Sequence, residues 1–383
     1  MSLFRDTVDK IKSNKANHDA GKVNCIPFEW MPRLRNVLPG IVKGTNWIVT
    51  ASSGVGKTQF TKHNFVYEPI KWVKNNPNKG VKIKVLYFAL EESKEEFMIS
   101  MISNRLYHQH GISIDPLSLM SMYEKGIDDD ILEKIEECEE YFKDFAQYID
   151  IVDSISNPTG IYKYIRNYSY ENGTHYYYNF KDDKEKKNTI PHEEYHKLTD
   201  TKNWAYSHYI PNDPDEYVIC IVDHFSLLQP EKTDDCNTLH KAMTKMSGEY
   251  GRKNVTKHWG YVFVNVQQQA AEGEKSEFTK MGDKIEEKFK PSLANLGDNK
   301  LTQRDAFVVL GVFSPARHGI KKYNGYDTGR MGDKFRTAEV LKNRLGKGYV
   351  EVPLFFNGAV NNLKELPKVE EMNESIYKMI DNI

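Results

Sequence analysis

The segment from Thr45 to Thr58, TNWIVTASSGVGKT, decides how the rest of the chain can fold. It begins with the apolar run Trp47–Val49, which is typical of a strand buried in a parallel sheet. The run gives way to the glycine-containing loop Ser52–Gly56, and a helical pattern opens at Lys57. Strand, loop, Lys-Thr and helix follow one another in the order of a phosphate-binding P-loop. The segment therefore predicts an α/β fold built around a phosphate site.

In a P-loop, backbone N–H groups of the loop and of the helix N-terminus point at phosphate oxygens. Lys57 is predicted to reach the β- and γ-phosphates of ATP, and the Thr58 hydroxyl to ligate Mg²⁺. Ala51 stands where the motif has its first glycine, and alanine is compatible with that place if its φ is negative. An ordinary strand–turn–helix is the alternative until a second motif is found. The predicted nucleotide-binding residues are Ala51, Ser52, Ser53, Gly54, Val55, Gly56, Lys57, Thr58 and Gln59.

The composition is that of a globular protein with a substantial core, since 39% of the 383 residues are hydrophobic and 28% are charged. A formal net charge of −1 provides no overall basic field, so any nucleic-acid binding must come from local patches. The four cysteines are far apart and form no CxxC pair, which fits a reducing compartment and favours neither a zinc site nor a disulfide framework. No apolar run approaches the roughly 18 residues of a membrane span. We therefore expect a cytoplasmic protein, or one made in a host cytoplasm.

Two adjacent glutamates follow a second predicted strand. This strand, Val85–Leu90, is followed directly by Glu91 and Glu92. A carboxylate at the carboxyl end of a strand beside a P-loop is where a catalytic base lies. The alternative for Glu92 is a capping role, because its charge suits the N-terminus of the helix predicted from Ser93.

Two further strands end in residues with predicted roles at the phosphates. The apolar strand Tyr217–Val222 closes on Asp223, which is the Walker B pattern, in which the carboxylate holds Mg²⁺ through water. Thr58 and Asp223 are therefore the predicted metal ligands. The strand Tyr261–Val266 runs into three glutamines, one of which could sense the γ-phosphate while the others are solvated.

The remaining strand signals complete the fold prediction. They are Ala306–Phe313, Ala338–Asn343 and Val350–Phe356. Residues 93–145 have a helical pattern, and a charged loop is expected over 272–290. Alternating strands and helices predict a doubly wound, mainly parallel sheet with helices on both faces and a ligand at the carboxyl ends of the strands.

Two segments stand apart from this pattern. Residues 1–25 are predicted to form an N-terminal arm with an amphipathic helix, which either docks on another molecule or packs back onto its own domain, residues 26–383. Residues 157–216 are read as a tyrosine-rich insertion, with a hairpin turn expected at Asn172–Gly173. Its aromatic and basic residues could stack on nucleic-acid bases, or the tyrosines could simply pack against one another.

Taken in order, these motifs resemble those of the replicative hexameric helicases of the DnaB type, within the RecA-like ATPases. The resemblance covers roughly residues 26–366. ASSGVGKT is similar to the Walker A motif of the family, and IVDHFSLLQ to its Walker B strand with Asp223. FALEES resembles the segment whose glutamate polarises the attacking water, which maps to Glu91. VFVNVQQQ resembles the strand with the sensor glutamine, best matched by Gln267.

Two more segments extend the resemblance towards DNA and towards a neighbouring subunit. KPSLANLGDNKLTQRDA is similar to the central-channel DNA loop of the family and the helix after it, with Gly297 in place of the loop arginine. The residues left to face the strand are Asp298, Asn299 and Lys300. LKNRLGKG resembles the Lys-x-Arg segment whose basic pair reaches the nucleotide of the adjacent subunit, and this pair maps to Lys342 and Arg344.

The resemblance implies an ATP- and Mg²⁺-dependent 5′→3′ DNA helicase. It would move along single-stranded DNA as a homo-oligomeric ring, a hexamer in the family, with a primase or another replisome protein as a further partner. Because only about fifty residues precede the P-loop, the N-terminal domain that meets primase is expected to be missing, as in a shortened phage protein. Two alternatives stay open: a strand-exchange ATPase of the RecA or KaiC type, and an ATP-dependent assembly or loader protein that does not unwind DNA.

Overall fold

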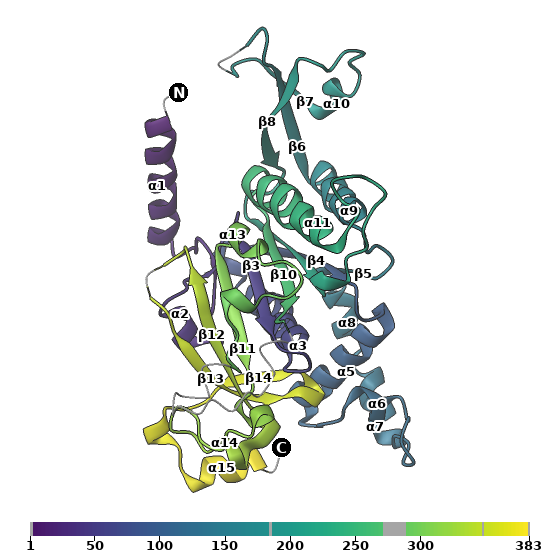
Figure 1. Ribbon diagram of the computed structural model, residues 1–383, viewed down its shortest axis with the longest axis vertical. Helices are drawn as coiled ribbons and strands as arrows, with labels where there is room; N and C mark the ends of the chain where they lie inside the picture. The colour runs from purple at the N-terminus through teal and green to yellow at the C-terminus, as the bar shows by residue number, and fades with distance from the viewer. Residues whose placement is uncertain (1–2, 184–185, 271–288, 347, 382–383) are drawn as a thin grey trace.

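A nine-stranded β-sheet forms the centre of the molecule in the computed structural model (Figure 1). The structure describes residues 3–183, 186–270, 289–346 and 348–381. From one edge to the other, the strands follow the order β14, β13, β12, β11, β3, β10, β9, β4, β5. Their bounds are β3 Asn46–Ala51, β4 Lys82–Ala89, β5 Ile149–Val152, β9 Glu216–Asp223, β10 Val262–Gln268, β11 Val308–Phe313, β12 Phe335–Asn343, β13 Glu351–Asn357 and β14 Asn362–Glu365. A separate two-stranded pair consists of β1 Ile26–Pro27 and β2 Gly40–Ile41.

The pairing divides this sheet into a parallel part and an antiparallel edge. The six strands from β11 to β5 run parallel to one another, whereas β12, β13 and β14 are antiparallel. The predicted α/β fold with a mainly parallel sheet is confirmed, and every strand predicted from an apolar run is present. The sequence pattern missed β5 and β14, which have only four residues each and so give too little periodicity.

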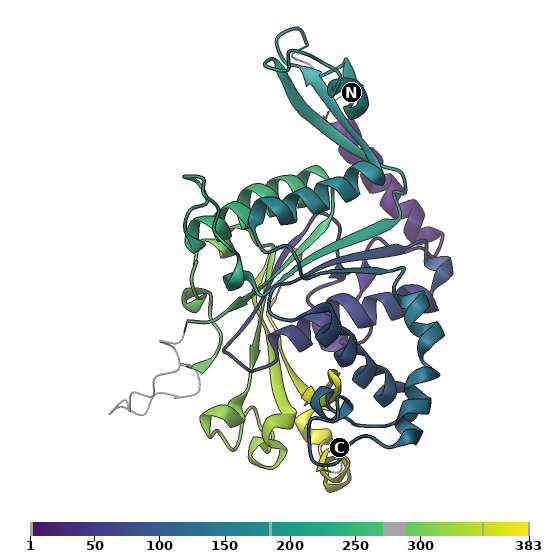
Figure 2. The same ribbon diagram turned by 90° about the vertical axis from the view of Figure 1, so that its right-hand side faces the viewer.

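Both faces of the sheet are buried, as expected for parallel strands whose crossovers place helices on each side (Figure 2). Along β9, Ile219 and Ile221 belong to one hydrophobic core while Val218 and Cys220 belong to the other, because successive strand residues point to opposite faces. The first core includes residues of α3 Lys57–Lys62, α4 Glu68–Asn75 and α5 Lys94–His110. The second includes residues of α9 Pro158–Glu171, α11 Leu239–Thr244 and the π-helix Lys245–His258.

The helical prediction for residues 93–145 is only partly right. α5 ends at His110, and Gly111 follows with a φ of 71°, a left-handed conformation that ends a helix. Three short helices replace the rest: α6 Pro116–Leu119, α7 Asp129–Glu136 and α8 Glu139–Phe145. The other short helices are α2 Pro32–Arg35, α13 Thr302–Asp305, α14 Thr328–Met331 and α15 Glu374–Asp381. The predicted charged loop over 272–290 lies almost entirely outside the described residues. Among those described, none of the helices combines the length and hydrophobicity needed to cross a bilayer.

Helix α1, Leu3–Asp19, extends away from the sheet and its helices (Figure 1). Phe4 and Ile11 on this helix are 75% and 62% exposed, so neither of these side chains packs into the core of the same chain. Of the two roles considered from the sequence, the structure favours docking on another molecule, which stays a prediction.

The tyrosine-rich region contains a core helix followed by a projecting arm. The predicted hairpin turn at Asn172–Gly173 is wrong, because α9 ends at that point and β6 begins there. Ile161 and Ile165, four residues apart, are buried against the sheet, which is the helical spacing that the turn signal obscured. The arm itself is a three-stranded antiparallel sheet that stands out from the body (Figures 1 and 2). Its elements are β6 Gly173–Asn179, β7 Thr189–Pro191, α10 His192–Tyr195 and β8 Trp204–Pro211.

Candidate active site

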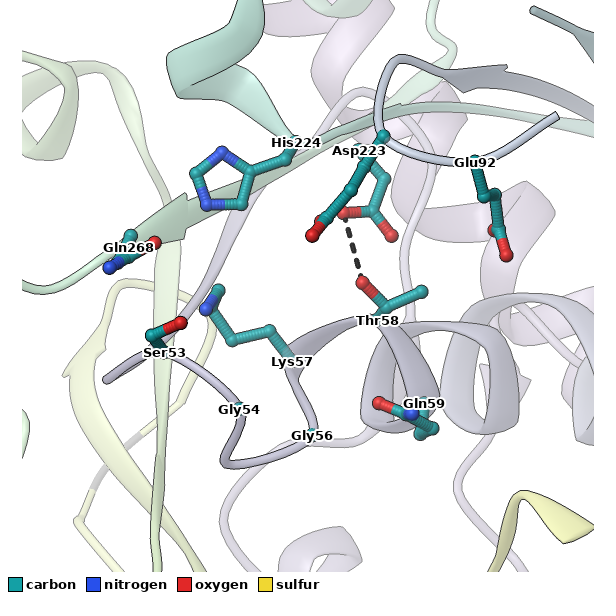
Figure 3. Close-up of a pocket in the computed structure, with 11 residues that line it drawn as sticks. Ser53, Gly54, Gly56, Lys57, Thr58, Gln59, Glu92, Asp223, His224 and Gln268 are labelled. Atoms are coloured by element: carbon teal, nitrogen blue, oxygen red, sulfur yellow. Dashed lines mark hydrogen bonds between the residues drawn. The ribbon is translucent and has the colours of Figure 1, made fainter. Parts of the chain in front are cut away.

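A cavity of about 310 Å³ opens at the carboxyl ends of β3, β4, β9 and β10 (Figure 3). Four parallel strands bring their ends to one edge here, which is where ligands bind in open α/β sheets. The side chains of Lys57 and His224 point into this space, and Asp223 lies beside it (Figure 3). The cavity is lined by Ser53, Gly54, Gly56, Lys57, Thr58, Gln59, Glu91, Glu92, Asp223, His224 and Gln268.

The loop between β3 and α3 has the backbone that its glycines require. Gly54 and Gly56 have φ values of 66° and 108°, in the region that favours glycine. A Cβ at Gly54 would lie 2.7 Å from the guanidinium of Arg317, which donates a 2.7 Å hydrogen bond to the Ser53 carbonyl. No sequence motif indicated that Arg317 lies at this loop. Ala51 is the last residue of β3, so its extended backbone explains why alanine is tolerated in place of the first glycine.

The side chain of Lys57 is buried against its own loop. It is 7% exposed, and its Nζ donates to the Ser52 carbonyl at 3.3 Å. The side chain therefore curls over the loop that is predicted to hold phosphate oxygens. A phosphate in the cavity would offer this ammonium group a stronger, charge-assisted acceptor than a neutral carbonyl.

Thr58 and Asp223 lie together, as predicted for a metal pair. The Thr58 hydroxyl donates to one carboxylate oxygen of Asp223 at 3.3 Å, and the Tyr87 hydroxyl donates to the other at 2.5 Å. Asp223 is 2% exposed, and burial raises the pKa of its carboxyl group. A hydroxyl and a buried carboxylate are hard oxygen donors that suit Mg²⁺. No group of three His, Cys, Asp or Glu side chains in the described chain could hold a metal alone, so substrate phosphates would have to complete the coordination.

The two glutamates after β4 are distinguished by their partners. Glu92 forms an ion pair with Lys62 at 2.8 Å, and Lys62 is 2% exposed and lies 4.0 Å from the ring centroid of Phe97. Glu91 is exposed and lines the cavity. Glu92 is not the helix cap that the alternative reading proposed, because Ser93 caps α5 in a capping box with Glu96. This arrangement supports Glu91 as the residue that can act on a water molecule.

Gln267, the predicted sensor glutamine, is held away from the cavity. Gln267 is fully buried, and its side-chain amide donates to the carbonyls of Gly297 and Asn299 at 2.6 and 2.9 Å. It does not line the cavity, whereas the next residue, Gln268, does. Consecutive residues of β10 point to opposite faces of the sheet, so only one of them can face the phosphates. His224 is a further cavity residue that the sequence analysis missed, and its only signal was its place directly after Asp223.

The predicted DNA-facing residues divide into exposed and buried ones. Asp298 and Lys300 are exposed. Asn299 is buried, and its amide donates to the His240 carbonyl and the Thr244 hydroxyl at 2.9 and 2.7 Å. The prediction that Asn299 faces the DNA strand is therefore wrong, because its side-chain N–H donors bind groups of the same chain. Gly297 is also buried, and a Cβ there would lie 2.9 Å from the Gln268 carbonyl, which leaves no room for an arginine on this backbone.

Lys342 and Arg344 lie at the end of the sheet where the parallel strands begin, opposite the end that carries the P-loop of the same chain. Arg344 donates its backbone N–H to the Phe307 carbonyl, and the backbone N–H of Phe307 donates to the carbonyl of Asn46 at the beginning of β3. The six residues of β3 separate this end from the P-loop, a distance of about 20 Å at the usual rise per strand residue. Burial, and then the charge of Arg344, lower the pKa of Lys342, whose Nζ donates to the Gln303 carbonyl.

Exchange of each glutamate for glutamine is expected to separate their roles. Glu91→Gln should still bind ATP but hydrolyse it about 10²- to 10⁴-fold more slowly, because it lacks the basic oxygen. Glu92→Gln is the matched control, and its main effect should be on stability, about 3 kcal/mol, because Lys62 would lose its charged partner. Phosphate release and thermal unfolding of both variants are the measurements. Slow hydrolysis in Glu92→Gln alone would assign the base to Glu92.

Comparison with known proteins places this geometry in a fold. A scan of protein-family models and a search of curated proteins both give no match. Among solved structures, the ATPase domain of G40P aligns with a TM-score of 0.64 and 14% identity, over 96% of this chain and 100% of that one. The structure of a DnaB-like replicative helicase and its interactions with primase aligns with a TM-score of 0.61 and 15% identity, over 96% of this chain and 68% of the other. The chain therefore has the RecA-like fold of these ATPase domains.

Proposed function

We propose that this chain is an ATP-driven DNA helicase of the DnaB type that works as a ring of identical subunits and moves 5′→3′ along single-stranded DNA. The observation that carries the proposal is that the predicted catalytic residues lie at two opposite ends of the sheet. The P-loop, Thr58, Asp223 and Glu91 lie together at the carboxyl ends of the parallel strands, and Arg344 lies at their amino ends. Arg344 can therefore reach a nucleotide only in a second subunit.

Within one subunit, the cavity residues can bind ATP and prepare its hydrolysis. Loop N–H groups and Lys57 bind the phosphates, and Thr58 and Asp223 would hold Mg²⁺. When bound, Mg²⁺ neutralises charge on the phosphate oxygens. Glu91 accepts a hydrogen bond from the attacking water and orients it towards the γ-phosphate. The arginine of the adjacent subunit stabilises the charge that develops in the transition state.

The contacts of β10 suggest how the nucleotide site acts on DNA. Gln268 lines the phosphate cavity, and Gln267 beside it holds the carbonyls of Gly297 and Asn299. A shift of the strand end after hydrolysis would therefore move the loop that carries the exposed Lys300. Repeated around a ring, this movement would carry one DNA strand through the centre.

A strand-displacement assay with and without ATP tests the proposal. Duplexes with a single-stranded tail at the 5′ or the 3′ end should be distinguished, with unwinding only from the 5′ tail. Pairing of homologous strands without unwinding would favour the RecA- or KaiC-type alternative. ATP turnover with no displacement from either tail would favour an assembly or loader protein.

The partners and location follow from the same proposal. A DnaB-like helicase was solved together with its interactions with primase, and we extend a primase or another replisome protein to this chain as a proposed partner. A role in replication would place it in the cytoplasm, or in that of a host if the protein comes from a phage.

Lys300→Ala should weaken binding to single-stranded DNA and lower the slope of log affinity against log salt by about 1, because one phosphate contact is lost. Lys378→Ala removes the same charge from an exposed position on α15 and is the matched control. Fluorescence anisotropy with labelled oligo(dT) at several salt concentrations gives both slopes. An unchanged slope for Lys300→Ala would mean that this loop does not contact the strand.

A further inference from the structure

A second cavity, of about 430 Å³, lies at the base of the arm. Its walls come from α9, from β6 and β8 of the arm, and from the end of the π-helix Lys245–His258. Trp259, which also lines it, precedes β10, and β8 leads into β9. The cavity is therefore near the amino ends of the parallel strands, at the edge opposite the P-loop. Its volume is within the usual range of small-ligand pockets.

Aromatic rings form much of this cavity. Tyr177 and Tyr206 are cross-strand neighbours of β6 and β8, and both line it. Each makes one stacked pair at its margin: Tyr177 with Tyr195 at 3.9 Å between centroids, and Tyr206 with His258 at 4.5 Å. These stacks hold the rings in fixed orientations. Flat, oriented rings in a half-buried cavity are the surfaces on which nucleic-acid bases stack.

The charged groups that line the cavity are all basic. On α9, Arg166 lies between Tyr162 and Tyr170, with its guanidinium carbon 5.7 and 5.8 Å from their ring centroids. These residues are spaced four apart and so share one helix face. Among the described residues, the buried Nε of Arg166 has no hydrogen-bond partner and its guanidinium forms no ion pair. The group is held in place by rings and is available to an anion.

The π-helix provides the opposite basic wall. Lys253 and His258 are five residues apart, which places them together on a helix with i→i+5 hydrogen bonds. Burial, and then the charges of Lys253 and Lys257, lower the pKa of His258. Among the residues that the structure describes, no aspartate or glutamate lines the cavity to balance Arg166 and Lys253. An unbalanced positive potential next to exposed ring surface favours a ligand that is both aromatic and anionic.

We propose that this cavity binds a nucleotide of single-stranded nucleic acid, with the base against Tyr177 and Tyr206 and the phosphate between Arg166 and Lys253. An acidic peptide would satisfy the basic groups but not the rings, so the lining favours nucleic acid. The proposal goes beyond the helicase function, because it adds a contact with single-stranded nucleic acid at the amino ends of the parallel strands. This contact is separate from the loop that carries Lys300. A strand held here would run along the base of the arm.

Binding of labelled oligo(dT) to the full chain without ATP tests this site. Arg166→Gln and Lys253→Gln should each weaken binding about tenfold, as expected for loss of a hydrogen bond to a charged group, and lower the salt slope by about 1. Lys163→Gln removes one charge from an exposed position of the same helix and is the matched control. Thermal unfolding of each variant shows that the fold is intact. Wild-type affinity in both cavity variants would overturn the proposal.

Two further experiments identify the ligand that occupies the cavity. Photocrosslinking of 5-iodouracil-substituted oligonucleotide, with peptide mapping, should label Tyr177 or Tyr206, and labelling confined to other regions would overturn the site. Competition with free dTMP and with poly-glutamate separates the sources. Displacement by poly-glutamate as readily as by unlabelled oligo(dT) would show an acidic-peptide site instead. Displacement by dTMP at low concentration would show a site for free nucleotide rather than for a strand. Lys300→Ala, measured in parallel, keeps failure of this site distinct from failure of the helicase proposal.

Discussion

Replacing Lys57 with alanine is expected to lower ATP turnover by at least about 100-fold, the loss seen when a group that stabilises developing charge is removed. Its Nζ lies over the loop, 3.3 Å from the Ser52 carbonyl, at the floor of the cavity predicted to hold the phosphates. Alanine removes the only lysine that lines this cavity in the described part of the chain. Phosphate release at saturating ATP is the measurement, because it separates lost chemistry from weakened binding.

The folded state should tolerate this substitution better than the reaction does. The Ser52 carbonyl would lose one hydrogen bond, worth about 1 kcal/mol for a typical intramolecular bond. Lys71→Ala, at an exposed lysine of α4 in the same helical run, is the matched control and should keep wild-type turnover. Turnover within a few-fold of wild type in Lys57→Ala would contradict the P-loop assignment. Loss of the native fold before heating would leave Thr58→Val to test the same cavity.

The second large effect is expected at Arg344. Arg344→Ala should lower turnover by about 10³-fold or more, the usual contribution of an arginine supplied to a phosphoryl-transfer site. In the described part of the chain Arg344 forms no ion pair with its own surface, and it lies at the amino end of β3, far from its own P-loop. If it merely stabilised that surface, its removal would cost no more than about 1 kcal/mol and would spare turnover.

Mixing two inactive proteins distinguishes a role within the subunit from one between subunits. A Lys57→Ala subunit still offers Arg344 to its neighbour, and an Arg344→Ala subunit still has an intact P-loop. If the arginine acts between subunits, some interfaces of a mixed ring are complete, and partial ATPase activity should return on mixing. Two inactive proteins that stay inactive although they exchange subunits would place the arginine elsewhere. Arg35→Ala, at an exposed arginine paired with Glu29, is the control and should leave activity and assembly unchanged.

The P-loop and its partners could be predicted from the sequence because their signals are local. An apolar run that breaks into Gly54 and Gly56 before Lys57 specifies strand, loop and helix within fourteen residues. An apolar strand that ends in Asp223 defines the opposite side of the site in the same way. The mainly parallel sheet followed from the alternation of such runs with helical patterns, and the strands are where the runs predicted them.

The tertiary structure decided which of two neighbouring residues faces a site. Gln267 and Gln268 are alike in sequence, as are Glu91 and Glu92, but the members of each pair have different surroundings: Gln268 lines the cavity and Gln267 does not, and Glu91 is exposed while Glu92 is ion-paired. Successive strand residues point to opposite faces, and the packed layers determine which face meets a ligand. Gln267 is fixed on Gly297, and Glu92 is paired with a buried lysine. These partners are far away in the sequence, so no local pattern reveals them.

The same reason applies to the residues that the sequence missed or misplaced. Arg317 reaches the Ser53 carbonyl from a distant turn, and Asn299 gives its donors to α11 and not to DNA. The distance from Arg344 to its own P-loop follows from the pairing of β12 with β11, which no motif contains. The sequence alone determined the chemistry available at the P-loop and the order of the strands that bear it. Only the folded sheet decided which side chains share an edge, because register and layer packing join residues that are far apart in the chain.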